Sequence, residues 1–248
     1  MKNTMTPERY GEIVTINVDV QNDFMPGGAL PVEGGDAVVN PLNRLNEWTR
    51  DRHGAVVFTR DWHPDDTAHF QEFGGPWPPH CRQYRAGAAF HDELRIDVEH
   101  SDTIASKGMS REDDGYSGYL AQIDVGRLAD LVTGLPPEQR TVAAAIDRML
   151  DMIAYSEKRK RMAILVGGLA TDYCVKATAH DALAATKRFR RPDGSRDVDV
   201  IVIPDAMRAV DVTPGDGDRA LAALIDARAL ALSSQQIIDG SVLVDRRS

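Results

Sequence analysis

The sequence predicts an α/β protein: three layers, α/β/α, around a central, mainly parallel sheet of about six strands. Two observations predict it. Short apolar runs of the kind that buried strands need alternate along the chain with longer segments of helical periodicity. The chain has 248 residues, enough for one substantial hydrophobic core, and no linker or break in composition divides it. We therefore expect residues 1–248 to form a single domain.

The first half of the chain should supply three strands. Ile13–Val18 reads as a buried strand, the segment from about Asp36 to Arg52 as a helix, and Ala55–Thr59 as the second strand. Residues 61–101 hold six of the fifteen aromatic residues and a dense set of prolines. A loop of that length within a compact domain is usually functional, and it leads into the strand Thr103–Ser106.

The second half continues the alternation after an extended helical segment at about 120–161, in which we expect two helices. The second of these places apolar residues on one face, namely Val142, Ala145, Ile146, Met149, Leu150 and Ile153. Met162–Val166 should be the next strand. The helix after Cys174 carries a face of small residues that should pack closely on the sheet: Val175, Thr178, Ala179, Ala182 and Leu183.

The chain should finish with a strand, a helix and a short strand. The strand covers Val198–Ile203, and we expect Pro204 to end it, because proline cannot donate a hydrogen bond within a sheet.

Charge and composition exclude several kinds of protein. A net charge of −9 weighs against nucleic-acid binding, and the one basic cluster, Lys158–Arg161, is expected to end a helix. We find no secretory signal at the N-terminus and no apolar stretch near the roughly 20 residues of a membrane span. Two cysteines, Cys81 and Cys174, make no disulfide framework, so a reducing cytoplasm is the expected location.

Three residues that follow strand-like runs could form a covalent catalytic site. These are Asp19, Lys107 and Cys174. The carboxyl ends of parallel strands meet at one crevice, where a carboxylate and an ammonium could activate a thiol. Each residue alone has an ordinary structural interpretation: a capping Asp, a solvated Lys, a buried core Cys. Together they predict that Cys174 is a nucleophile.

The surroundings of Cys174 favour that interpretation. The residue lies in the glycine-containing segment Gly167–Cys174, which should turn from strand to helix. A helix N-terminus and a nearby ammonium are expected to lower the thiol pKa, and backbone N–H groups of such a turn can stabilise an oxyanion.

A second cluster has the composition of a metal site. Asp61, His63, His69 and His80 lie within one segment, and one carboxylate with two or three imidazoles can bind Zn²⁺, Fe²⁺ or Mn²⁺. The ordinary alternative for each histidine is a solvated position on a loop.

These motifs together resemble the nicotinamidases, within the isochorismatase-like cysteine hydrolases, whose Rossmann-like fold agrees with the expected sheet. The matching segments run in the family's order: Asp19–Phe24, Gly27–Leu30, Asp61–Pro64, Trp77–Cys81, Lys107–Gly108, Tyr116–Gly118 and Gly168–Val175.

The resemblance implies hydrolysis of nicotinamide to nicotinate and ammonia through a thioester on Cys174. Asp19 would accept and donate the proton, and Lys107 would hold the thiolate and that carboxylate in register. A cis peptide would precede Ala170, and the N–H groups of Ala170 and Cys174 would form the oxyanion hole.

The resemblance also implies a divalent metal, with Zn²⁺ the first expectation and Fe²⁺ or Mn²⁺ the alternatives. Asp61, His63 and His80 match its ligands, and His69 matches a ligand found in some members. The metal would orient the pyridine nitrogen of the substrate. Phe24, Trp77, Tyr116 and Tyr173 match positions that wall the flat substrate pocket.

Two segments depart from the family. The stretch from Tyr119 to Met162 is longer than its norm, and the tail after Ser234 has no obvious counterpart. The first could alter contacts in a homo-oligomer or lid the pocket, and the tail could pack on a partner subunit.

Other functions stay open at this point. The first is hydrolysis of another small amide, such as a carbamoyl or ureido compound, although many such relatives lack the histidines. A binding module without turnover and a metal hydrolase with a structural Cys174 are further alternatives. Hydrolysis of isochorismate is disfavoured because it needs no nucleophilic Cys.

Overall fold

The computed structural model describes residues 10–99, 102–154, 161–187 and 198–240. They contain one seven-stranded sheet of order β4-β3-β2-β1-β5-β6-β7, in which every neighbouring pair is parallel except β3 and β4. The strands are β1 (Tyr10–Val18), β2 (Ala55–Asp61), β3 (Asp102–Lys107), β4 (Gln122–Gly126), β5 (Arg161–Leu169), β6 (Val198–Arg208) and β7 (Leu230–Ala231). The expected mainly parallel sheet is confirmed, with one strand more than expected.

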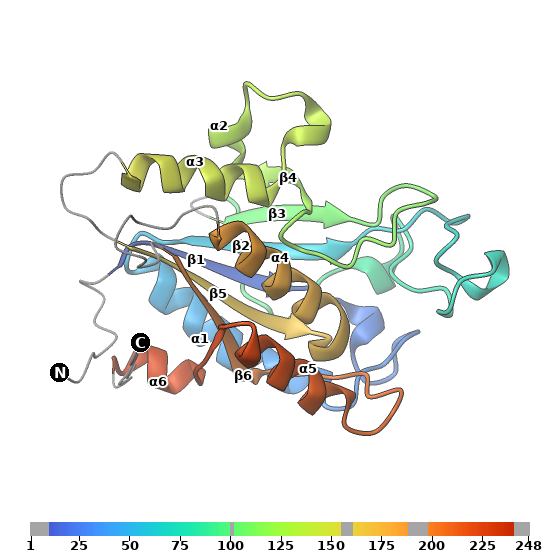
Figure 1. Cartoon of the computed structure of the whole chain (residues 1–248). Coiled ribbons are helices and arrows are strands. Elements are labelled where there is room, and N and C mark those ends of the chain that lie inside the picture. The colour runs from blue at the N-terminus through green and yellow to red at the C-terminus, as the bar shows by residue number, and fades with distance from the viewer. Residues whose placement is uncertain (1–9, 100–101, 155–160, 188–197, 241–248) are drawn as a thin grey trace.

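Helices cover both faces of the sheet, which gives the expected three layers (Figure 1). Helices α3, α4 and α5 lie on one face, and α1 and α6 lie on the other. The helices are α1 (Val39–Arg50), α2 (Ala129–Val132), α3 (Val142–Ala154), α4 (Lys176–Thr186), α5 (Asp216–Asp226) and α6 (Ser234–Ile238).

Strand β1 lies at the centre of the sheet and packs helices on both sides. Val14 and Ile16 are wholly buried in the core on the α3 and α4 side. The alternate residues face α1, where Asn17 bonds Asn46 at 3.0 Å and Thr15 bonds a threonine of the same helix. Because these polar side chains satisfy one another, the middle of the sheet is buried at little cost.

The expected helical segment at about 120–161 contains the strand that the sequence did not predict. β4 occupies the start of this segment and runs antiparallel to β3 at the sheet edge. Two helices follow as expected, although α2 is a single turn. The predicted apolar face of α3 is buried from Val142 to Leu150, and the side chain of Ile153 lies outside the described residues.

The prediction that Pro204 ends its strand is wrong. β6 continues to Arg208, and the ladder with β5 passes from the pair Val166–Val202 to the pair Gly168–Met207. Three extra residues of β6 therefore bulge out between these pairs. A bulge has no ladder hydrogen bond to lose, so it accommodates a proline.

Three further predictions concern the rest of the chain. The small-residue face of α4 is buried, as expected. Of the basic cluster, Lys158–Lys160 lies outside the described residues, and Arg161 begins β5 instead of ending a helix. The tail after Ser234 starts with α6, which packs on α1 of the same chain.

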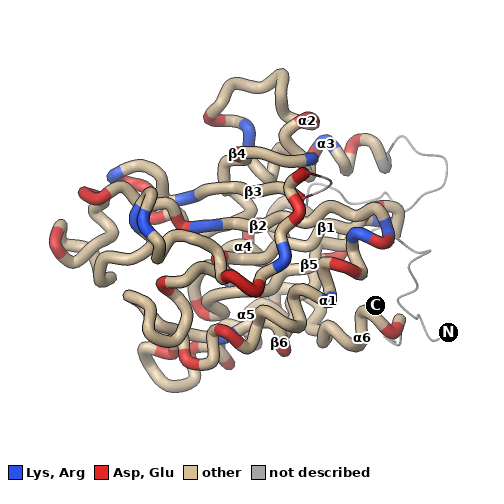
Figure 2. The backbone as a smooth tube through the Cα atoms, turned by 180° about the vertical axis from the view of Figure 1, so that it is seen from behind, with Lys and Arg blue, Asp and Glu red and all other residues tan. Residues whose placement is uncertain are grey.

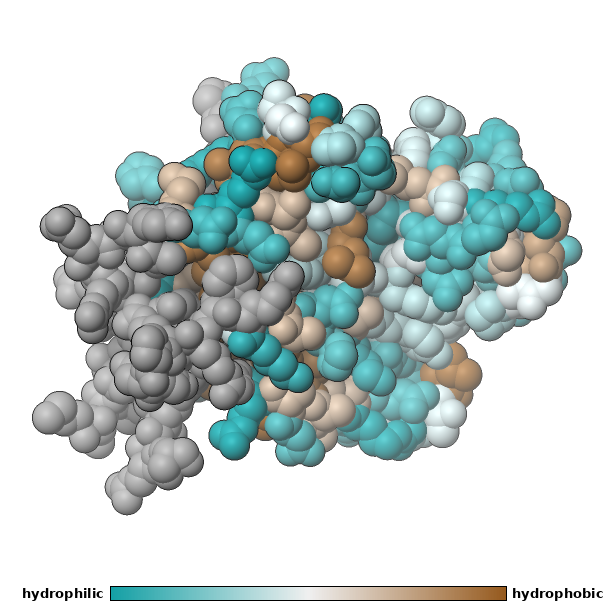
Figure 3. All heavy atoms as spheres, turned by 45° about the horizontal axis from the view of Figure 1, so that its top comes forward, coloured by the Kyte–Doolittle hydropathy of each residue, from teal (hydrophilic) through white to brown (hydrophobic). Residues whose placement is uncertain are grey.

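The described surface agrees with an acidic protein. Figure 2 shows Lys and Arg spread among Asp and Glu, and on the face in Figure 3 apolar residues form small, separate patches. Among the described residues, no helix has both the length and the apolar character to cross a membrane.

Candidate active site

The catalytic candidates lie together because parallel strands end at the same edge of the sheet. Asp19 follows β1, Asp61 ends β2, and Lys107 ends β3 as the ladder partner of Asp61. Cys174 lies in a π-helical turn, Thr171–Val175, that follows β5. The edge that the sequence predicts is thus built from four segments that are distant in the chain.

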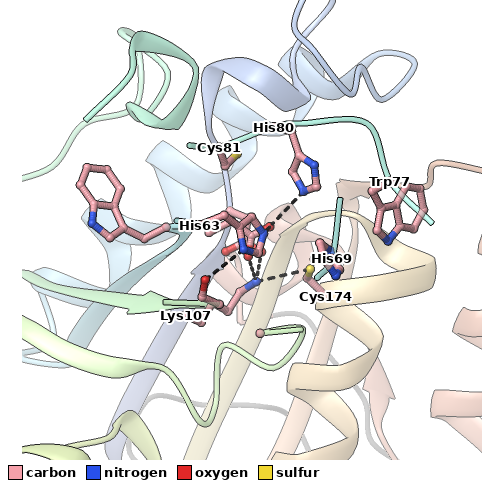
Figure 4. A network of polar contacts seen from close by, with 12 residues as sticks. His63, His69, Trp77, His80, Cys81, Lys107 and Cys174 are labelled. Atoms are coloured by element: carbon pink, nitrogen blue, oxygen red, sulfur yellow. Dashed lines mark hydrogen bonds and ion pairs between the residues drawn. The ribbon is translucent and has the colours of Figure 1, made fainter. Parts of the chain in front are cut away.

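Lys107 occupies the middle of this group (Figure 4). Its Nζ lies 2.8 Å from Oδ2 of Asp19 and 3.5 Å from Sγ of Cys174, and it also donates a hydrogen bond to Oδ1 of Asp61. All four residues are buried. One cation therefore holds two carboxylates and the thiol in contact, away from water.

The acid–base properties of the group follow from its burial. Burial raises the pKa of Asp19 to about 6, although Lys107 and Thr59 act in the opposite direction. Burial also raises the pKa of the Cys174 thiol well above its ordinary value, more than Lys107 lowers it. The expected lowering of the thiol pKa is therefore wrong for the resting site, in which the thiol is neutral and lies beside the Asp19 carboxylate.

Asp61 connects this group to a cluster of three histidines. Its Oδ2 lies 3.8 Å from Nε2 of His63 and 3.9 Å from Nε2 of His80. His69 completes the cluster: each of the three histidines offers a ring nitrogen, and these nitrogens lie within 4.8 Å of one another. The structure thus brings together all four residues of the predicted metal set.

The donors of this cluster fit a divalent metal ion. Nδ1 of His63 bonds the Gly108 carbonyl at 3.0 Å and Nδ1 of His80 bonds the Pro78 carbonyl at 2.8 Å, which turns both Nε2 atoms toward Asp61. Nε2 of His63 is buried without a hydrogen-bond partner. Burial lowers the pKa of His80, and that of His69 to about 4, so the ligating neutral form of both prevails.

The turn after Lys107 is fitted to His63. Gly108 has a φ of +62°, and a Cβ there would lie 2.4 Å from Cε1 of His63. Glycine at this position lets the backbone turn directly against the imidazole ring, so the lysine strand and the histidine cluster are fixed relative to each other.

A pocket opens over the thiol and the cluster. All four aromatic residues predicted for the substrate pocket line it: Phe24, Trp77, Tyr116 and Tyr173. Trp77 Nε1 donates a hydrogen bond to the Tyr116 hydroxyl at 2.9 Å, and the Trp77 and Tyr173 rings meet edge to face, which makes a rigid aromatic wall.

Two apolar lining residues, Leu30 and Val210, were not predicted as site residues. Leu30 lies in a segment that matched the family, but its small apolar side chain carries no chemical signal of its own. Val210 follows β6 in a segment without a motif. Its N–H donates to a carboxylate oxygen of Asp172, and this bond ties the loop to the turn that carries Cys174.

The predicted oxyanion-hole residues also meet the pocket. Ala170 and Cys174 both line it, and the peptide bond between Leu169 and Ala170 is cis. Just before this bond, Gly168 has a φ of +122°, and a Cβ there would lie 2.1 Å from the Val18 carbonyl oxygen. The end of β5 can therefore lie directly against β1, which places the turn that carries Cys174 beside Asp19.

Comparison with known protein families and sequences gives matches over most of the chain. The isochorismatase domain family matches residues 14–111. The nicotinamidase of Escherichia coli (strain K12) is 34% identical over 218 residues, which covers 82% of this chain and 86% of that protein.

Solved structures show the same similarity. The pyrazinamidase of Pyrococcus horikoshii in complex with zinc has 32% sequence identity and a TM-score of 0.63, with 89% of this chain and 98% of that chain covered. PnC1 from L. infantum in complex with nicotinate has 29% identity and a TM-score of 0.68, with 95% and 98% covered.

Proposed function

The chain belongs to the nicotinamidases of the isochorismatase family, and from this premise we propose that it hydrolyses nicotinamide to nicotinate and ammonia at the site around Cys174. The observation that carries the proposal is a single buried arrangement. Lys107 joins Asp19, Cys174 and Asp61, and Asp61 in turn faces the histidine cluster beneath an aromatic pocket.

In the acylation half, Asp19 accepts the proton of the Cys174 thiol, and Sγ attacks the carboxamide carbon. Lys107, 3.5 Å from Sγ, stabilises the thiolate as it forms. The N–H groups of Ala170 and Cys174 bind the oxyanion. Asp19 then returns its proton to the leaving nitrogen, the C–N bond breaks, and ammonia departs from a thioester.

In the deacylation half, a water molecule attacks the thioester carbon while Asp19 accepts one of its protons. The C–S bond breaks, nicotinate forms, and the proton on Asp19 returns to the Cys174 sulfur. Asp19 thus acts as base and acid in each half, and a pKa of about 6 suits both roles near neutral pH.

His63, His80 and Asp61, with His69, would hold the divalent metal ion, for which Zn²⁺ is the first candidate and Fe²⁺ or Mn²⁺ the alternatives. When bound, the ion supplies a coordination position for the pyridine nitrogen of the substrate. The zinc in the Pyrococcus horikoshii pyrazinamidase supports this assignment.

Phe24, Trp77, Tyr116 and Tyr173 would bind the substrate ring. The hydrogen bond between Trp77 and Tyr116 holds both side chains in place. This suits a flat heteroaromatic ring, because neither side chain has to be ordered when the ring enters.

The remaining proposals concern the setting of the enzyme. Its product nicotinate places it in NAD salvage, within pyridine nucleotide biosynthesis. Cys81 and Cys174 are free thiols, which supports a cytoplasmic location. We propose that residues 1–248 form a single domain and that its partner is a small-molecule substrate. We also propose a homo-oligomer, which light scattering would test.

The deciding experiment is ammonia release by the purified, metal-replete protein from nicotinamide, with isochorismate and a small ureido amide alongside. We expect fast turnover of nicotinamide alone. Activity restricted to another amide would agree with the Cys174 mechanism but would refute nicotinamide as the substrate. No hydrolysis of any of the three would refute the proposal.

A further inference from the structure

Gln21 has no role in the proposed chemistry, yet its side chain is wholly buried next to the site, and its amide makes three hydrogen bonds. Its Oε1 accepts a hydrogen bond from the N–H of Asp61 at 2.8 Å. Its Nε2 donates to the carbonyl of Asp61 at 2.8 Å and to the carbonyl of Ala88 at 2.9 Å. The side-chain amide of Gln21 thus bonds both the N–H and the carbonyl of the Asp61 backbone.

These hydrogen bonds take the place of the ladder bonds that β1 would make with Asp61 if it continued alongside β2. The ladder between β1 and β2 ends at the pair Val18–Thr59, two residues before Asp61. On its other side Asp61 pairs with Lys107 of β3. The Gln21 amide presents one acceptor and one donor, as a strand does, and so satisfies the backbone of Asp61 where β1 no longer runs alongside.

The orientation of Asp61 matters because its two oxygens serve different groups. Oδ1 accepts from Lys107, while Oδ2 faces Nε2 of His63 and of His80. A small rotation of the backbone here would move one oxygen away from the catalytic lysine or the other away from the histidines.

The segment that follows β1 also contacts the loop that carries His80. Oδ2 of Asp23 accepts a hydrogen bond of 2.7 Å from the N–H of Cys81, the next residue after His80. The residues that follow β1 therefore hold both Asp61 and the neighbour of His80 from one side.

We propose that Gln21 is a positioning residue that fixes the Asp61 carboxylate between Lys107 and the histidine cluster, and that it thereby sets the metal affinity of the site. The proposal rests on the metal site of the proposed function and on the described contacts of Gln21. A group that orients a metal ligand typically changes metal affinity by about 10- to 100-fold when it is removed.

The test is Zn²⁺ affinity of metal-free protein, measured by competition with a chromophoric chelator in the absence of substrate. Gln21→Met keeps the length and removes all three hydrogen bonds. We expect Zn²⁺ to bind about 10- to 100-fold more weakly. Gln21→Glu keeps the acceptor for the Asp61 N–H but places a carboxyl oxygen against the carbonyls of Asp61 and Ala88, so it should also weaken Zn²⁺ binding.

Asn43 provides a matched control. Its buried amide also bonds the backbone, with Nδ2 donating to the Glu93 carbonyl at 2.8 Å and Oδ1 accepting from the Arg95 N–H at 2.9 Å, and neither partner belongs to the histidine cluster. Asn43→Leu should lower thermal stability as Gln21→Met does and leave Zn²⁺ affinity unchanged.

The outcomes separate a positioning role from a structural one. Zn²⁺ affinity within about twofold of the original in folded Gln21→Met, or an equal loss in Asn43→Leu, would overturn the proposal. If Gln21→Met does not fold, Gln21→Glu decides by the same criterion. Because no substrate is present, a protein inactive on nicotinamide could still support this role of Gln21.

Discussion

Thr59 donates a hydrogen bond of 2.7 Å from its Oγ1 to Oδ1 of Asp19, the oxygen that Lys107 does not approach most closely. Thr59 precedes Asp61 by two residues on β2, so both side chains face the site from one strand. Both oxygens of the buried Asp19 carboxylate therefore have a polar neighbour. The contact with Thr59 favours the ionised form and opposes the effect of burial on the pKa.

We predict an acid limb in the pH dependence of kcat/KM near pH 6. Asp19 must be ionised to accept the thiol proton, and its pKa of about 6 lies above its ordinary value. Below that pH the protonated fraction grows, so kcat/KM should fall about tenfold per pH unit. Steady-state rates measured at intervals of about half a pH unit, from about pH 4.5 to about pH 8, would test this dependence. A flat profile across pH 6 would exclude Asp19 as the base.

Thr59→Val should move this limb to higher pH. The substitution keeps the shape and removes a hydrogen bond to a charged group, so the pKa of Asp19 should rise by about one to two units. Thr15→Val is the matched control, because Thr15 is equally buried and bonds Thr49 away from the site. Its acid limb should coincide with that of the unaltered protein.

Cys174→Ala should abolish turnover, by about 10⁴-fold or more, and leave metal content intact. The thiol contacts Lys107, and the histidine cluster that would hold the metal does not include it. Rates of ammonia release together with elemental analysis check both parts. Substantial residual activity would refute the covalent mechanism and favour a metal hydrolase.

His63→Ala and His80→Ala should each lose metal and substrate affinity together. Both rings direct Nε2 toward Asp61, and the loss of either removes one of the few ligands of the site. Metal stoichiometry after dialysis and KM for nicotinamide measure the effect. Metal retained at the original stoichiometry would contradict the ligand assignment.

Lys107→Met should destabilise the metal-free protein by about 3–5 kcal/mol, because it leaves the Asp19 and Asp61 carboxylates buried without their cation. Urea denaturation gives the free energy of unfolding. Arg60→Met is the control, since Arg60 forms a partly exposed ion pair with Asp124 at 3.1 Å; because Arg60 also contacts Ser106 and the Trp62 ring, the loss should be about 1–2 kcal/mol. Equal losses in the two variants would contradict the proposed importance of burial.

Much of the site could be predicted because its chemistry depends on residue types at strand ends. Asp19, Lys107 and Cys174 each follow an apolar run, and parallel strands bring such ends together. The thiol pKa could not be predicted in the same way, because it depends on how deeply the folded chain buries the group. The sequence shows Gln21 only as part of a motif, since a side chain that bonds the backbone of a distant strand leaves no pattern in the sequence.

The errors in the fold have similar causes. β4 is a short edge strand with four of its five residues outside the buried core, so it lacks the apolar run of a buried strand. Pro204 would end a regular strand, but the register change between β5 and β6 accommodates it. That change depends on the partner strand, which a local pattern does not include.

The order of strands in the sheet also constrains how the protein is made. β1 pairs with β2 on one side and with β5 on the other, where Val14 lies opposite Ile164, about 150 residues later in the chain. During synthesis, strands β1 to β4 can assemble first and leave one whole edge of β1 without its neighbour. Because an open apolar edge invites pairing with other chains, we expect the nascent protein to be prone to aggregation until β5 leaves the ribosome.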